Sequence, residues 1–347
     1  MEFESDSEKL YNAFVNVVRH GKNNNTYKFA LAKFLLDYSK EHDKVKVNVK
    51  YKDIAKKFFD YYWLQECRYR LRQGPKNQVP LVIKIIREEF DEENYPYRLN
   101  KIKLKHSSKI KRCILNITNN CFDDVIPRLE DDAEHCFGKP RKAQSKKRIF
   151  YDYHAIEYRD SANNKRVDSK GGVRLNPYLI NMLKENNDTL FIVVVFEWIK
   201  FLEKRNVGIP NLVEKIANNE LMPRDQRKFI EYLEGLTDRC FYCNNKLKSG
   251  KNTHVDHFLP YDYVGTTELW NLVLACQKCN CKKSNSLPPE SFVKKLEIRN
   301  EEHRNKKDEL GMSLKTLWNE NEFKQYYSNA MSYRFPTWCG PAQNDPA

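Results

Sequence analysis

Apolar residues recur at helical spacing between Glu8 and Glu92. Three apolar faces follow one another there, each built from residues three or four positions apart, and the first ends at Gly21. The faces consist of Leu10, Phe14, Val17 and Val18; of Tyr27, Leu31, Phe34, Leu35 and Tyr38; and of Ile54, Phe58, Tyr62 and Trp63. Because so many of these residues are aromatic, the pattern predicts a helical region with an aromatic core.

The pattern changes in the middle of the chain. Alternating residues in KRIFYDYHAIEYRD, and the glycine pair before VRLNPYL, predict a small sheet. The run LFIVVVF at 190–196 follows a cap at Asp188 or Thr189 and suits a buried helix, although its β-branched residues also suit a strand. The next segment, 210–236, indicates two helices divided by Pro223.

A basic strip occupies residues 95–112. Its sequence, YPYRLNKIKLKHSSKIKR, contains seven lysines and arginines and no acid, interleaved with tyrosine, leucine and isoleucine. Such a strip can follow a phosphate backbone. The alternative is the solvated face of an ordinary amphipathic element, and the sequence leaves both open.

Composition narrows the class of protein. A chain of 347 residues is long enough for two domains, or for one domain with appendages. The formal charge of +14 favours a polyanionic partner, with nucleic acid first, because lysine and arginine release condensed counterions from phosphates. A soluble protein that is merely rich in lysine is the alternative.

The ends and apolar runs predict a soluble, cytoplasmic protein. The N-terminal MEFESDSEKL lacks the positive and apolar regions of a secretory signal. The longest purely apolar run, Leu190 to Phe196, is far shorter than the roughly 20 residues that span a bilayer.

The cysteines divide into two groups. Five lie singly and are typical of small buried apolar residues: Cys67, Cys113, Cys121, Cys136 and Cys339. Two CxxC pairs, Cys240 with Cys243 and Cys276 with Cys279, enclose residues 244–275, and four thiolates in this arrangement predict a closed structural zinc site. Zinc supplies folding free energy that so small an insert lacks. Cys281 is left without a role.

The insert reads as two strands and a helix. THVDHFL has strand character and stops at Pro260, a polar loop leads to WNLVLAC, and QKCNCKKSN can open a helix. With both CxxC pairs, Asp256 and His257 in VDHF, Asn271, Asn280 and Lys283, this segment closely resembles the zinc-containing HNH endonuclease family and its ββα-metal fold. The resemblance covers residues 238–288 only.

The resemblance implies a role for each of these residues. His257 is the expected general base, since imidazole takes up protons near neutral pH. Asp256 and Asn280 are the expected ligands of a catalytic Mg²⁺ or Mn²⁺, which prefers oxygen donors. Asn271 is expected to orient the His257 ring and the loop. In a regular strand Asp256 and His257 point to opposite faces, so the expectation requires a bend there.

Three further residues are candidates for contact with DNA or its phosphates. His254 shares a strand face with Asp256 and is either a further metal ligand or a structural or phosphate-binding residue. Lys282 and Lys283 are the other two. The competing interpretation of the whole segment is a non-catalytic zinc ribbon that binds nucleic acid or senses an effector.

The sequence therefore predicts an α+β protein. A mainly helical and mixed α/β recognition or sensing region would occupy 1–236, with a possible division near 94–140. A zinc-stabilised HNH nuclease domain would occupy 237–300, and helices with a tail 301–347. The expected activity is hydrolysis of DNA, double-stranded by preference, in restriction or anti-phage defence. A cut in both strands would suggest a homodimer, because one ββα site holds one scissile phosphate.

Overall fold

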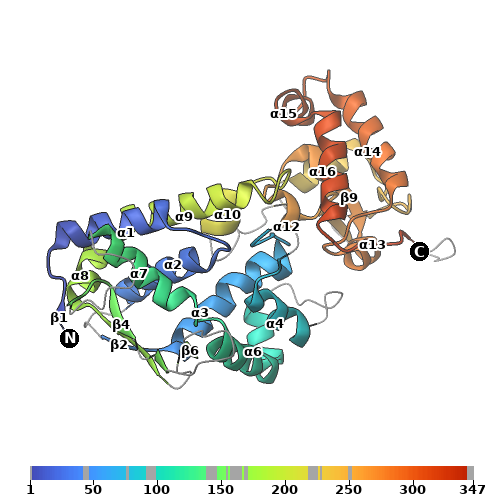
Figure 1. Cartoon of the computed structure of the whole chain (residues 1–347). Helices are drawn as coiled ribbons and strands as arrows, with labels where there is room; N and C mark the ends of the chain where they lie inside the picture. Colours follow the sequence, from blue (N-terminus) through green and yellow to red (C-terminus); the bar gives the residue numbers. More distant parts are fainter. Residues whose placement is uncertain are drawn as a thin grey trace. The chain divides into compact units, whose positions relative to one another are not determined.

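A computed structural model describes residues 2–41, 47–75, 78–90, 99–137, 147–153, 155–156, 166–167, 171–217, 226, 229–248 and 252–341. The chain divides into two compact units, 1–206 and 207–347 (Figure 1). This division falls earlier in the chain than the boundary expected at 236. The expected extent of the nuclease domain, 237–300, stays a prediction.

The first unit is mainly helical. Its helices are α1 (Ser7–His20), α2 (Tyr27–Glu41), α3 (Tyr51–Trp63) continued by a π-helical turn (Leu64–Arg68), α4 (Leu81–Glu89), α5 (Leu99–Lys105), α6 (Ser107–Asn120), α7 (Val125–Cys136), α8 (Pro177–Glu185) and α9 (Asn187–Glu203). Local chemistry fixes several helix starts. Asp6 accepts a hydrogen bond from the Lys9 amide, and Asn176 accepts one from the Tyr178 amide, with Pro177 at the first helical position.

Small sheets cover part of these helices. β2 (Asn48–Lys50), β7 (Gly172–Leu175) and β4 (Tyr151–Tyr153) form an antiparallel sheet with β7 in the centre. β1 (Glu2–Phe3) pairs with β3 (Lys147–Arg148), and β5 (Ala155–Ile156) pairs with β6 (Arg166–Val167). Gly172 is required because a Cβ there would lie 2.0 Å from the Val49 carbonyl oxygen.

The core of the first unit is aromatic, as the sequence predicts. Its largest fully buried side chains are Trp63, Trp198, Tyr51, Tyr62, Tyr69, Tyr151, Phe14, Phe34, Phe58 and Phe59. Rings from distant helices touch: Phe29 of α2 stacks on Trp198 of α9 at 6.3 Å between centroids. Truncation of such a side chain to alanine typically costs about 3–5 kcal/mol.

The segment 190–196 is helical, and the strand alternative is wrong. The helix that the sequence favours is present and is buried on one side: α9 buries Leu190 and Val194, while Ile192 and Phe196 are 67% and 60% exposed. Pro223 and residues 95–98 lie outside the described residues. Within the segments that the structure describes, no helix combines the length and apolarity that crossing a bilayer requires.

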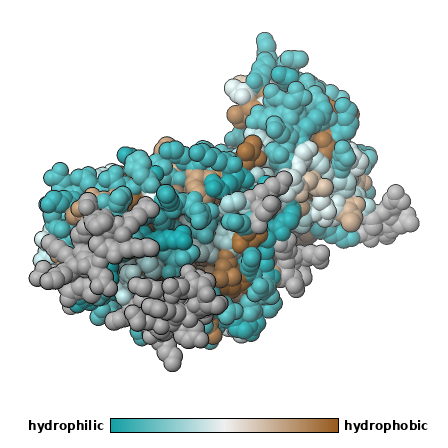
Figure 2. Space-filling model, viewed as in Figure 1, coloured by the Kyte–Doolittle hydropathy of each residue, from teal (hydrophilic) through white to brown (hydrophobic). Residues whose placement is uncertain are grey.

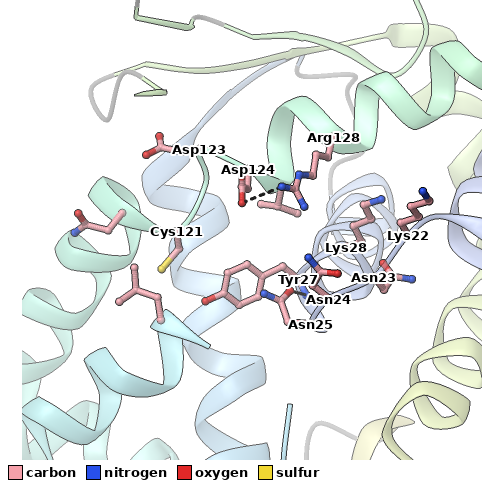
Figure 3. A pocket seen from close by; sticks show the side chains of 13 residues that line it. Lys22, Asn23, Asn24, Asn25, Tyr27, Lys28, Cys121, Asp123, Asp124 and Arg128 are labelled. Carbon is pink, nitrogen blue, oxygen red and sulfur yellow. Dashed lines mark hydrogen bonds and ion pairs between the residues drawn. The ribbon is translucent and has the colours of Figure 1, made fainter. Parts of the chain in front are cut away.

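A cavity of about 300 Å³ opens in the first unit beside the start of α2, the end of α6 and the start of α7 (Figure 3). Two of its cations are bound to carboxylates: Lys28 to Asp132, and Arg128 to Asp124 at 3.4 Å. The cavity therefore presents little excess charge of either sign. On the face of the molecule drawn in Figure 2, the surface is mainly hydrophilic with scattered hydrophobic residues.

The second unit contains the two strands and the helix expected from the insert. Its elements are α10 (Leu212–Ala217), α11 (Ile230–Leu236), β8 (Thr253–His257), α12 (Tyr261–Val264), a 3₁₀ turn (Leu269–Asn271), β9 (Leu272–Cys276), α13 (Gln277–Lys283), α14 (Glu290–His303), α15 (Glu309–Leu317) and α16 (Glu320–Ser332). β8 and β9 are antiparallel, and α13 follows β9 directly and packs against both strands.

Candidate functional site

Four cysteines gather at one end of this hairpin. Cys240 and Cys243 come from the turn after α11, Cys276 ends β9, and Cys279 lies in α13. Their sulfur atoms all lie within 4.8 Å of one another, and the Cys243 and Cys276 sulfurs are 3.8 Å apart. Four ligands at about 2.3 Å from a tetrahedral zinc ion have sulfurs about 3.8 Å apart. The cluster therefore fits a structural zinc ion.

The hairpin register determines how the candidate residues are presented. His254 pairs with Ala275, Asp256 with Val273, and His257 with Leu272. The side chains of Asp256 and His257 contact separate groups of residues, which agrees with the alternation of a strand. Both are nearly buried, at 5% and 3% exposure.

Asp256 lies in a buried network. The Tyr242 hydroxyl donates to its Oδ2 atom at 2.6 Å, and the Lys283 ammonium nitrogen lies 3.0 Å from the same atom. Burial raises the pKa of Tyr242 well above its usual value, so this hydroxyl stays protonated and remains a donor. A buried carboxylate paired with an ammonium group avoids the cost of an isolated charge.

Lys283 does not lie at the surface, contrary to what a phosphate contact requires. It is fully buried, and besides Asp256 its ammonium group donates to the His257 carbonyl oxygen at 2.7 Å. Lys283 thus links α13 to two consecutive residues of β8.

The His257 ring is held at both nitrogens. Nδ1 lies 2.5 Å from the Gln226 side-chain nitrogen, and Nε2 lies 3.1 Å from the Thr267 hydroxyl. The Tyr261 ring meets it edge-on at 5.1 Å between centroids. These contacts fix the ring plane at the end of β8.

Asn271 holds the backbone beyond β8, whereas its expected bond to the His257 ring is not among its hydrogen bonds. Its side-chain oxygen accepts from the Leu259 amide at 2.8 Å, and its side-chain nitrogen donates to the Leu259 carbonyl at 3.1 Å. Phe258 also donates to the Asn271 carbonyl, at 2.8 Å. The fully buried Asn271 therefore closes the turn that follows the histidine.

Arg299 of α14 holds the 3₁₀ turn that carries Asn271 and the start of β9. Its guanidinium group donates to the carbonyl oxygens of Trp270 at 2.9 Å and Leu272 at 2.5 Å. Asn300 adds a bond to the Trp270 carbonyl at 3.1 Å. Burial lowers the pKa of Arg299 to about 10, so it is still charged at neutral pH.

The remaining candidates lie nearer the surface. Asn280 is half-buried in α13, three residues before Lys283, so the two are neighbours on the surface of the helix. His254 is half-buried on β8, and Lys282 is exposed.

Sequence reasoning missed three contacts of the site. Tyr242 lies inside the first CxxC pair, and its position between two zinc ligands was a signal that it would face the hairpin. Gln226 and Thr267 belong to no motif in the sequence. Only the folded chain brings them to the His257 ring.

One comparison with known proteins bears on this segment. The model of the HNH endonuclease family matches residues 240–286. Among solved structures, the chain is similar to the crystal structure of the Type II-C Cas9 enzyme from Actinomyces naeslundii, with 13% sequence identity and a TM-score of 0.19. The similarity covers 95% of this chain and 39% of that chain. A TM-score this low does not establish a shared fold. No curated protein gives a significant match.

Proposed function

Residues 240–286 belong to the HNH endonuclease family, and from this premise we propose that the protein is a metal-dependent endonuclease that hydrolyses phosphodiester bonds in DNA. The observation that carries the proposal is the His257 ring, held at both nitrogens at the end of β8 in a ββα unit whose hairpin carries the four-cysteine cluster at its other end. The charge of +14 supports a polyanionic substrate.

His257 acts as the general base in this proposal. A base must present an imidazole nitrogen in a fixed direction toward the water that it deprotonates. Gln226 and Thr267 hold the ring at its two nitrogens, and the Lys283 bond to the His257 carbonyl fixes the backbone. Because the base needs one nitrogen available to the water, the attacking water has to replace one of these two partners while the other keeps the ring in place. Asn271 acts through the turn at Leu259 and is a positioning residue.

Asp256 and Asn280 would hold the catalytic divalent ion. A carboxylate and a carboxamide offer the oxygen ligands that Mg²⁺ and Mn²⁺ prefer, so the donor set fits. When bound, such an ion stabilises charge on the phosphoryl oxygens. It has to share Asp256 with the Lys283 ammonium group, which already lies 3.0 Å from the carboxylate. Because the register of β8 is regular through His257, the strand also has to bend there before Asp256 and His257 can act on one phosphate.

The test is a DNA cleavage assay with purified zinc-loaded protein and added Mg²⁺ or Mn²⁺. His257→Ala is expected to reduce the cleavage rate at least about 100-fold, the usual loss when a general base is removed. His135→Ala, an exposed histidine of α7 outside the second unit, is the matched control and should cut at the normal rate. Equal cleavage by both variants would contradict the proposal.

A non-catalytic zinc-ribbon protein that binds nucleic acid or senses an effector is the second candidate. The observation in its favour is the near-complete burial of Asp256 and His257. It predicts DNA binding that needs no added Mg²⁺ or Mn²⁺ and that survives His257→Ala, with no cleavage under any ionic condition.

The biological role that we propose is restriction or defence against foreign DNA, with the first unit choosing the target. The first unit has a hydrophobic core of its own, which supports a task separate from that of the second unit. Phage DNA and DNA with modified bases are the substrates to compare. Double-strand cutting that rises with the square of protein concentration would support action as a homodimer.

A further inference from the structure

The end of α5 and one side of α6 in the first unit carry a set of exposed residues, which we call the α5–α6 face. It consists of Lys105, Ser108, Lys111, Leu115 and Asn119, all exposed. The four residues in α6 are spaced three or four apart and so lie on one side of the helix. The opposite side packs against α3 and α4.

This face carries a local excess of positive charge. Residues 99–120 contain six lysines and arginines and no acid. Two of these cations are bound elsewhere: Lys103 to Asp60 at 3.0 Å, and Arg112 to Glu89 at 2.8 Å. Lys105 and Lys111 make no ion pair with any part of the chain that the structure describes.

The face also exposes apolar side chains among its cations. Leu115 is 59% exposed, and Leu104, next to Lys105, is 86% exposed. On a surface that docks DNA, cations bind phosphates while exposed apolar groups cover sugar and base edges.

We propose that the α5–α6 face docks the backbone of a DNA duplex. From Ser108 to Asn119 the helix rises about 16 Å, which spans about five phosphates of one strand. Lys105 and Lys111 bind phosphates, and Ser108 and Asn119 donate hydrogen bonds to phosphate oxygens. The identity of the polyanion rests on the proposed function, whereas the face itself does not.

The experiment measures duplex binding against salt between about 50 and 200 mM, without divalent ions so that nothing is cut. Lys105→Ala with Lys111→Ala should lower the slope of log affinity against log salt by about 2, because each lysine releases about one counterion. Affinity at low salt should fall at least tenfold, equally for unrelated sequences. Alanine favours the helix, so both elements should still form.

Lys184→Ala with Lys204→Ala is the matched control. These lysines are equally exposed in the first unit, also make no ion pair among the described residues, and lie on α8 and at the end of α9. An unchanged slope in the Lys105 and Lys111 variant, or an equal loss in the control, overturns the proposal. So does a loss of binding to vesicles of anionic lipid with DNA binding intact.

The outcome is separate from that of the nuclease proposal. His257→Ala should bind duplex with the normal slope, since the histidine lies outside this face. Normal salt-dependent binding without cleavage refutes the nuclease and leaves the docking face standing. If the unmodified protein cleaves DNA and the Lys105 and Lys111 variant keeps an unchanged salt slope, the nuclease proposal stands and the docking face is refuted.

Discussion

Two buried lysines hold segments of backbone in place in the second unit. Lys283 and Lys215 have almost no exposure. Lys283 donates to a backbone carbonyl of β8, and Lys215 donates to one of α12. Lys283 is paired with Asp256. Lys215 donates to the carbonyls of Pro210 and, at 2.6 Å, Tyr263. Their task is to fix backbone around the site.

Lys215 makes the stability of the second unit depend on pH. Burial lowers its pKa to about 7, although the charge of Asp262 opposes the shift. Between pH 7 and the usual lysine pKa of 10.5, the unfolded chain binds a proton that the folded chain does not. The free energy of unfolding therefore rises with pH in this window, by on the order of 5 kcal/mol.

Lys215→Met should remove that pH dependence. Urea unfolding of the variant at several pH values between 7 and 10 should show a flatter curve than the unmodified protein. Lys204→Met, at an exposed position, should leave the curve unchanged. Parallel curves for Lys215→Met and the unmodified protein would show that Lys215 keeps its proton when folded.

At the scale of elements, the four-cysteine cluster joins the start of the ββα unit to its end. Cys240 and Cys243 precede β8, while Cys276 and Cys279 lie where β9 meets α13. One ion bound by all four thus fixes the positions of β8 and α13, the elements that carry His257 and Asn280. Trp338, near the end of the described chain, adds a stacked contact with Phe292 of α14.

Cys276→Ser should lose most of the bound zinc and, with it, the folded ββα unit, because metal binding supplies folding free energy. Zinc per chain, measured by mass spectrometry or a chromogenic chelator, should be about one in the unmodified protein and close to zero in the variant. Cys281→Ser, at an exposed thiol of the same helix, is the control and should keep its zinc. Full zinc content in Cys276→Ser would refute a four-cysteine site.

At the scale of the whole molecule, two separate cores predict two unfolding transitions. The first unit is organised around buried aromatic rings, and the second around the hairpin, the cysteine cluster and α14. Units with their own cores generally unfold as separate cooperative blocks.

Trp198→Ala tests this independence. Trp198 is fully buried in α9, so its truncation should cost about 3–5 kcal/mol and lower the midpoint of one thermal transition by roughly 10 °C. A second transition, moved by zinc chelation, should stay in place. Equal displacement of both transitions in calorimetry would show that the units unfold as one.

The sequence by itself determined the helical character of the first unit, the order of elements around the hairpin and the identity of the four clustered cysteines. Helical spacing indicated the aromatic core, CxxC pairs indicated the zinc ligands, and the order of strand, strand and helix followed from local pattern, because these signals depend on near neighbours. Tertiary structure decided the partners: Lys283 turned inward to Asp256, Asn271 bound Leu259, and Gln226 reached His257. Such contacts join residues far apart in the chain, and their geometry exists only once packing has brought the elements together.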